Sequence, residues 1–279
     1  MSKKKSDFKL KDYLSSLKNT YISKAFFMDK LPANVCRIID YGCADGSFIE
    51  FLRKNFGQKY YYSGVEINQD MKKMCNDKNI TVYQSLNNIV TSRTKLLSKT
   101  YGNAKTLEDA CINFSSTLHE INNSDLENVF IYSPAVVAIR DMNVHTIRDD
   151  NNEYTINLIH KFAKYYPSKF KDFCDNKEFN NRNLNLSDCV HFMLKYFYDN
   201  GWERELKEDY LSTNDKINMF IKWSSKIYEV IYYRKYNLQY LLDKWRDDGI
   251  LDEQTYDLFS RDLITTHQEI IFRRKTDNQ

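Results

Sequence analysis

The 279-residue chain contains little glycine, little proline and no long apolar run. Its 7 glycines and 3 prolines reflect overall composition more than chemistry. No apolar stretch approaches the roughly 20 residues that a transmembrane helix needs, which argues against a membrane-spanning protein. The basic N-terminus, residues 1–7, is followed by a mixed segment rather than by the apolar region of a secretory signal. We therefore expect a cytoplasmic protein.

Close cysteine pairs and a strong charge of one sign are also missing. The 6 cysteines are scattered and form none of the C-x-x-C pairs that mark zinc or redox sites, so we expect reduced, mostly buried thiols and no metal site. The net charge of +3 is too weak to indicate a nucleic-acid-binding protein by bulk electrostatics. Any such binding would have to be local.

Short apolar strands alternate with helical patterns through the first half of the chain. Expected strands lie at 35–39, 60–65, 80–83, 110–114, 135–139, 227–233 and 268–273, with helices at 47–56, 68–77 and 86–97 among the first of them. This alternation predicts an α/β fold, a doubly wound and mainly parallel seven-stranded sheet with helices on both faces.

The pattern changes after the fifth strand to helices separated by asparagine-rich breaks. The expected helices are 156–166, 186–198 and 215–223. We expect residues 143–223 to be a helical insertion, a lid or substrate region, within a core formed by 35–142 and 224–279. Residues 1–34 form an N-terminal segment in which an amphipathic helix is expected from Asp12 to Leu31, because apolar residues recur there at helical spacing: Leu14, Leu17, Tyr21 and Ile22.

A glycine-containing turn joins the first strand to the next helix. Between Asp40 and the helix, Gly42, Ala44 and Gly46 leave a backbone almost without side chains, near outward-pointing amide groups, so that a ligand can approach it closely. Ligands of open α/β sheets bind at the carboxyl ends of the strands. Glu66 ends the second strand, where a carboxylate can accept from two ribose hydroxyls. The alternative is a tight turn without a ligand.

The spacing of this turn disfavours a dinucleotide. A nicotinamide or flavin site needs G-x-G-x-x-G around the pyrophosphate, whereas Ala44 with Asp45 breaks that spacing and adds a negative charge. The segment from Asp40 to Phe48 instead resembles the first motif of class I S-adenosylmethionine methyltransferases, D/E-x-G-x-G-x-G, with Ala44 in place of the middle glycine. Residues 64–68, 110–116, 135–142 and 266–273 are similar to the family's second, fourth, fifth and antiparallel seventh strands.

The resemblance implies a Rossmann-like methyltransferase fold, S-adenosylmethionine as the cofactor and methyl transfer as the reaction. The glycine turn would face the methionine part, Glu66 would bind the ribose, Asp40 would orient the turn, and Gln84 or Ser85 would lie near the adenine. The family's acidic residue after the third strand has no obvious counterpart here. The cofactor-binding residues implied are Asp40, Gly42, Ala44, Gly46, Glu66, Gln84, Ser85 and Asn113.

Polar residues after the fourth and fifth strands are the candidates for catalysis. Methyl transfer from a sulfonium is an in-line displacement that depends on positioning and needs no nucleophile on the protein. A general base helps when the acceptor loses a proton. His119 is the best single candidate, with Glu120 and Asp141 next. Alternatively, His119 and Glu120 only open the following helix.

The candidates for contact with the acceptor are Ser115, Ser116, Arg140, Trp202 and Arg204. Arg140 could meet an anionic group, although an exposed ion pair with Asp141 is an alternative. Trp202 and Arg204 belong to a charged run at 201–210, which either lines the substrate entrance or is a solvated helix face anchored by Trp202.

Two catalytic motifs are absent. Asn123 occupies the second histidine position of H-E-x-x-H, which excludes a zinc protease at that site, and no N-P-P-aromatic motif follows Asn113. The sequence does not identify the acceptor. Arginine, lysine and tyrosine interleave at 228–236, which favours a nucleic acid or nucleotide-bearing acceptor, although strand packing explains this alternation equally well. The alternative function is a non-catalytic binding or scaffold protein that retains this fold.

Overall fold

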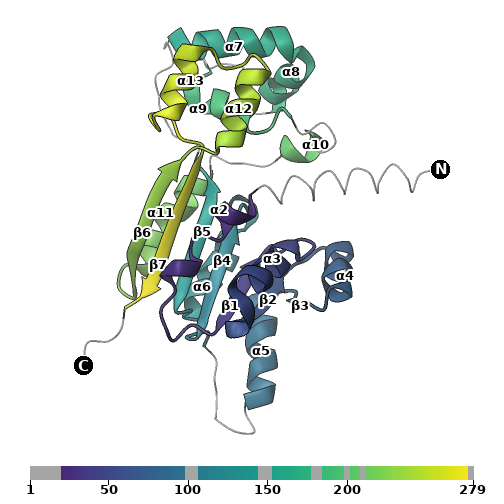
Figure 1. Ribbon diagram of the computed structural model, residues 1–279, viewed down its shortest axis with the longest axis vertical. Coiled ribbons are helices and arrows are strands. Elements are labelled where there is room, and N and C mark those ends of the chain that lie inside the picture. Colours follow the sequence, from purple (N-terminus) through teal and green to yellow (C-terminus); the bar gives the residue numbers. More distant parts are fainter. Residues whose placement is uncertain are drawn as a thin grey trace, which may run out of the picture. The chain divides into compact units, whose positions relative to one another are not determined.

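The computed structural model describes residues 20–97, 106–143, 153–176, 184–197, 202–207 and 212–275 (Figure 1). It confirms the mainly parallel seven-stranded sheet, whose strand order is β3-β2-β1-β4-β5-β7-β6. The strands are β1 (Arg37–Tyr41), β2 (Tyr61–Val65), β3 (Thr81–Tyr83), β4 (Ala110–Ser115), β5 (Val136–Met142), β6 (Tyr228–Tyr236) and β7 (His267–Arg274).

The first five strands are parallel to one another, and the last strand is antiparallel to its neighbours. Pairs β1–β2, β2–β3, β1–β4 and β4–β5 are all parallel. In β7, the amide of Arg274 donates to Ala135 at the start of β5, and Thr266 accepts from Asn143 just after the end of β5. Strand order reverses between β1 and β4, so the edge beyond Tyr41 and Ser115 is the switch point where ligands of such sheets bind.

Local sequence signals mark the ends of several helices of the sheet region. The helices are α2 (Tyr21–Lys24), α3 (Ser47–Phe56), α4 (Gln69–Asp77), α5 (Leu86–Leu97) and α6 (Asn123–Ile131), with single 3₁₀ turns at Met28–Lys30, Gly57–Lys59 and Leu118–Glu120. Gly57, with φ of 71°, ends α3. Asn68 accepts from the amides of Asp70 and Met71 at the start of α4, and Asn122 caps α6 in the same way.

The N-terminal helix is shorter than expected. Of the predicted range 12–31, residues 12–19 lie outside the described part of the chain, and the rest contains only the four residues of α2 and the following 3₁₀ turn. Ile22, expected on the apolar face, is 83% exposed, whereas Tyr21 and Phe27 are buried. The prediction of one continuous amphipathic helix is therefore wrong for residues 20–31.

The chain divides into two compact units. The sheet unit comprises residues 1–140, 219–233 and 269–279, and the helical unit comprises 141–218 and 234–268. The helical unit contains α7 (Glu153–Tyr165), α8 (Pro167–Asn176), α9 (Leu186–Met193), α10 (Trp202–Glu205), α12 (Gln239–Asp247) and α13 (Glu253–Ser260), while α11 (Ser212–Ser224) crosses the boundary. The expected insertion, 143–223, does not include α12 and α13, which the sequence analysis assigned to the core.

The helical unit has a hydrophobic core of its own. Phe162, Phe192, Trp245 and Phe259 are completely buried within one cluster. The indole nitrogen of Trp245 donates to the carbonyl of Met193 at 3.1 Å, which satisfies its only donor inside this core. A core of this kind explains why α12 and α13 fold with the inserted helices.

Among the described residues, no helix combines the length and apolar character required to cross a bilayer. Most cysteines are buried, as expected, although Cys36 is exposed and Cys174 is half-buried.

Candidate functional site

The turn after β1 adopts a backbone conformation that favours glycine. Gly42, Ala44 and Gly46 have φ angles of 73°, 47° and 76°. A Cβ atom on Gly42 would lie 2.4 Å from Cγ2 of Thr117, and one on Gly46 would lie 2.5 Å from Cδ1 of Ile80. In the sequence, glycine at these positions indicates room for a ligand beside the backbone. The structure adds a second reason for glycine at 42 and 46, because protein side chains pack against both α-carbons.

Glu66 connects this turn to the end of β2. It lies at the carboxyl edge of the sheet, as predicted from the sequence. Its Oε2 atom accepts from the amide of Ala44 at 3.0 Å, and its Oε1 atom accepts from the amide of Asn68 at 2.8 Å. The amides of Gly42 and Cys43 donate to the carbonyl of Val65 at 2.8 and 3.1 Å. The carboxylate therefore organises the loops after both strands.

Asp45 does not leave an unbalanced charge in the turn. Its carboxylate lies 2.7 Å from the Lys78 ammonium and accepts from the Ser47 hydroxyl at 2.6 Å. Burial alone would raise the pKa of the Asp45 carboxyl, but the hydrogen bonds from Lys78 and Ser47 hold it below its usual range. The negative charge noted in the sequence is thus offset by Lys78.

A cavity of about 70 Å³ opens beside the turn. It is lined by residues of α2, the turn, α3 and the loop after β4: Tyr21, Lys24, Asp40, Gly42, Cys43, Ala44, Asp45, Phe48, Ser115, Ser116 and Thr117. Sequence reasoning did not include Tyr21 and Lys24 in the site. Tyr21 had been noted only as part of an apolar stripe, and a single lysine in a basic N-terminal region carries no signal of a site.

Asp40 is a buried carboxyl in the wall of this cavity, with 4% of its surface exposed. Asn113 donates to its Oδ1 atom at 2.7 Å. Burial raises the pKa of Asp40 to about 6, although the hydrogen bond from Asn113 and the charge of Lys24 act in the opposite direction. Asn113 itself is fully buried and is not among the residues that line the cavity. Its position links it to the site through Asp40.

The two residues proposed to lie near an adenine follow β3 at the same edge of the sheet. The Ser85 hydroxyl accepts from the amide of Asn88 at 3.3 Å, so it caps α5. Gln84 is exposed. Their contact with a cofactor stays a prediction.

Arg140 lies at the carboxyl end of β5, and its guanidinium is buried, with 1% exposure of the residue. Its Nη1 atom donates to the Ser116 hydroxyl at 3.0 Å. Among the described residues, Nε and Nη2 of Arg140 and the Ser115 hydroxyl have no hydrogen-bond partner. Asp141 is buried as well, and its Oδ1 atom accepts from the amide of Met142. The alternative of an exposed ion pair between Arg140 and Asp141 is therefore wrong.

Two of the three catalytic candidates are neighbours in the chain and in the structure. His119 and Glu120 share the 3₁₀ turn after β4, with 3.8 Å between Nε2 and Oε1. The His119 side chain is buried and does not line the cavity, while Asp141 belongs to the helical unit. Asn122 caps α6, so the alternative that His119 and Glu120 open the next helix is also wrong.

Trp202 is anchored in the helical unit. Its indole nitrogen donates to Oδ2 of Asp172 at 3.1 Å, and its ring centre lies 6.3 Å from that of Phe192. This agrees with the interpretation of an anchored helix face. The side chain of Arg204 and residues 201 and 208–210 lie outside the described part of the chain.

Neither a protein-family model nor a curated protein sequence matches this chain. Among solved structures it is similar to the plantazolicin methyltransferase BamL, at a TM-score of 0.50 and 11% identity over 99% of this chain and 92% of that one. The chain has the class I methyltransferase fold. Lower scores relate it to the methyltransferase domain of a bacterial CtHen1 (0.44, 14% identity, 92% and 98% covered) and to an S-adenosylmethionine-dependent methyltransferase from Archaeoglobus fulgidus (0.42, 14% identity, 91% and 93% covered). The resemblance noted at Asp40–Phe48 is confirmed at the level of the fold.

Proposed function

We propose that this chain transfers a methyl group from S-adenosylmethionine to an acceptor. The observation that carries the proposal is the turn Gly42–Gly46, which lies at the switch point of a methyltransferase fold and is joined by Glu66 to the end of β2. BamL, which shares this fold, was solved with SAH, the demethylated form of that cofactor.

The residues at this edge suit the cofactor. The cavity beside the turn has a volume of about 70 Å³, roughly the volume that two water molecules occupy in liquid water. It is large enough for only one end of the cofactor. The ribose would then lie at Glu66 and the adenine near Gln84. The bound cofactor supplies an electrophilic methyl group together with sulfonium and ammonium charges. The Asp40 carboxylate complements positive charge in the cavity. Because burial raises the pKa of Asp40 to about 6, affinity falls as the pH decreases below that value.

The acceptor carries a negative charge that Arg140 recognises. Burying a guanidinium without a counter-charge costs several kcal/mol, and the Nε and Nη2 atoms of Arg140 have no partner among the described residues. An anionic group of the acceptor would satisfy them, with the Ser115 and Ser116 hydroxyls beside it. This supports the preference for a nucleic acid or nucleotide-bearing acceptor.

Positioning supplies most of the catalytic effect, and His119 removes a proton where the acceptor has one to lose. Because the His119 side chain is buried beside Glu120, the loop that follows β4 would have to open for an acceptor to reach it. Glu120 and Asp141 are the next candidates.

Calorimetry with S-adenosylmethionine and SAH tests the cofactor assignment. Glu66→Gln keeps the shape of the side chain but removes its charge and one acceptor, so we expect affinity to fall by about 1–3 kcal/mol. Glu127→Gln, an exposed residue of α6, is the matched control and should leave affinity unchanged. Equal affinity in wild type and Glu66→Gln would remove the assignment.

Incubation with labelled S-adenosylmethionine and fractions of a cell extract tests turnover separately. Transfer of label to a component of the extract is the expected result. Cofactor binding without transfer to any fraction would instead favour the scaffold alternative.

A further inference from the structure

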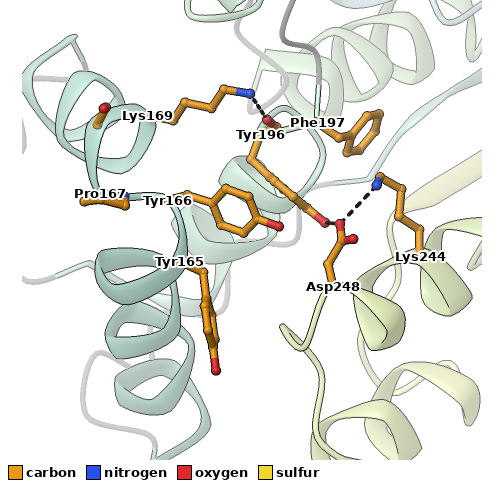
Figure 2. A pocket seen from close by; sticks show the side chains of 9 residues that line it. Tyr165, Tyr166, Pro167, Lys169, Tyr196, Phe197, Lys244 and Asp248 are labelled. Atoms are coloured by element: carbon orange, nitrogen blue, oxygen red, sulfur yellow. Dashed lines mark hydrogen bonds and ion pairs between the residues drawn. The ribbon is translucent and has the colours of Figure 1, made fainter.

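The helical unit contains a cavity of about 420 Å³, within the range of roughly 300–1,000 Å³ found for small-molecule sites. It lies where the end of α7 and the start of α8 approach the chain after α9 and one face of α12 (Figure 2). We call it the helical-unit pocket. Its lining residues are Tyr165, Tyr166, Pro167, Ser168, Lys169, Tyr196, Phe197, Lys244 and Asp248.

Aromatic rings form much of the wall of the helical-unit pocket. The rings of Tyr166 and Tyr196 pack with their centres 4.5 Å apart, which fixes both. Tyr165 is 48% exposed and Phe197 is half-buried, so parts of both side chains remain accessible. Empty packing defects have apolar walls, whereas these rings share the wall with charged groups. Flat rings of this kind stack on nucleobases without selecting one base.

Two lysines hold positive charge at fixed places in the same wall. Lys169 donates to the carbonyl of Tyr196, and its ammonium lies 5.4 Å from the ring centre of Trp202. Lys244 pairs with Asp248 at 3.0 Å and lies 5.9 Å from the ring centre of Phe197. Figure 2 shows Lys169 and Lys244 on different elements of the pocket.

Asp248, the acidic residue of the pocket, is paired with Tyr196 and Lys244. The Tyr196 hydroxyl donates to Asp248, and burial together with this hydrogen bond raises the pKa of Tyr196, so the phenol keeps its proton. Two lysines and one carboxylate leave the wall with an excess of positive charge. Ser168 and Lys169 stand in the first turn of α8, which contains no acidic residue and whose dipole adds to that charge.

We propose that the helical-unit pocket binds a nucleotide, with the base against Tyr165, Tyr166 and Phe197 and the phosphate near Lys169 and Lys244. The combination of stacking rings with separate cations matches the two parts of such a ligand. The site is distinct from the cofactor cavity, and the proposal does not depend on methyl transfer.

Titration of the full chain with adenosine and uridine 5′-monophosphates tests this site. Calorimetry gives the affinity, and a change of tryptophan fluorescence that is absent in Trp202→Phe reports binding beside Lys169. Lys169→Gln and Tyr165→Ala should each raise the dissociation constant about tenfold. Lys171→Gln removes the same charge from an exposed position of α8 outside the pocket, and Glu66→Gln alters only the cofactor site; both should change affinity less than twofold.

The nucleoside and inorganic phosphate, titrated separately, should each bind at least about tenfold more weakly than the nucleotide. The absence of saturable binding by either monophosphate would overturn the proposal. So would an equal loss in Lys171→Gln and Lys169→Gln, which indicates unspecific attraction, or phosphate binding as tight as that of the nucleotide. If Lys169→Gln lowers the melting temperature, Tyr165→Ala, at a half-exposed residue, still decides the question.

Discussion

Asp40→Asn should make the protein more stable at neutral pH while weakening the proposed cofactor site. Burial raises the pKa of Asp40 to about 6, about two pH units above the usual value of about 3.9 for aspartate. The folded state therefore holds this proton more tightly than the unfolded chain does. The stability that it contributes is complete below about pH 4 and is lost as the pH rises through about 6.

The size of the effect follows from the same numbers. One pH unit corresponds to about 1.4 kcal/mol, so a charged Asp40 costs up to about 3 kcal/mol above pH 7. An asparagine at position 40 keeps a side-chain oxygen that can accept from Nδ2 of Asn113. Its NH2 group adds a donor for Oδ1 of Asn113, an atom that has no hydrogen-bond partner among the described residues. Loss of the attraction to Lys24 acts against this gain. We expect Asp40→Asn to raise the free energy of unfolding by about 1–3 kcal/mol at pH 8.

Urea unfolding at constant ionic strength between pH 4.5 and 8 measures this difference. The advantage of Asp40→Asn should be small at pH 4.5 and should reach its full value near pH 7. Asp29→Asn is the control, because Asp29 is exposed beside Lys30 and the hydrogen bond from Lys30 lowers its pKa; its effect should stay within about 0.5 kcal/mol. Parallel pH curves for wild type and Asp40→Asn would refute the reasoning.

Four further predictions concern other residues. Gly46→Ala should destabilise by about 1–2 kcal/mol more than Gly249→Ala, because the two glycines have similar φ angles of 76° and 73° but only the new Cβ at 46 meets neighbours, Ile80 and Cys75; urea unfolding compares them, and equal losses would contradict the packing argument. Arg140→Met, which replaces the buried guanidinium by an apolar side chain of similar length, should stabilise the free protein by about 1–2 kcal/mol and raise the KM of the acceptor, whereas a large loss of stability would show that the guanidinium already has its counter-charge. His119→Asn should lower turnover about a hundredfold with unchanged cofactor affinity. Full turnover in this variant would show that His119 is not the general base. Asp252→Ala should destabilise by about 1–2 kcal/mol at pH 7, since burial alone would raise the pKa of Asp252 but hydrogen bonds with Thr255 and Lys161 lower it, and the loss should decrease progressively as the pH falls below about 4.

Hydrogen exchange tests whether the helical unit acts as a lid or substrate region. Amides of α7 and α9 should exchange more slowly once acceptor and cofactor are bound, if this unit acts as the lid or substrate region. Unchanged exchange in both helices with a turning-over acceptor would argue against that role.

The elements that sequence predicts best are those whose signals are local. Helix α3 has the predicted bounds because its apolar residues recur at helical spacing between a glycine turn and Gly57. Strands β1 to β5 were predicted from short apolar runs, and their ends differ from the predicted bounds by no more than three residues. A helix was expected after His119 and Glu120, but the bounds of α6 were not predicted, because its asparagine-rich start hides a short apolar face. The boundary of the helical insertion was displaced, because a periodic pattern does not show which core a helix joins.

The sequence by itself determined the sheet, the glycine turn and the place of Glu66, because each depends on neighbours within a few residues or on the end of one strand. Tertiary structure decided which distant side chains meet. It set Lys24 near Asp40, joined Arg140 to Ser116 and packed Thr117 against Gly42. It also assembled the helical-unit pocket from α7, α8 and α12. These contacts depend on the packing of segments that are separated by many residues, and that packing leaves no periodic signal in the chain.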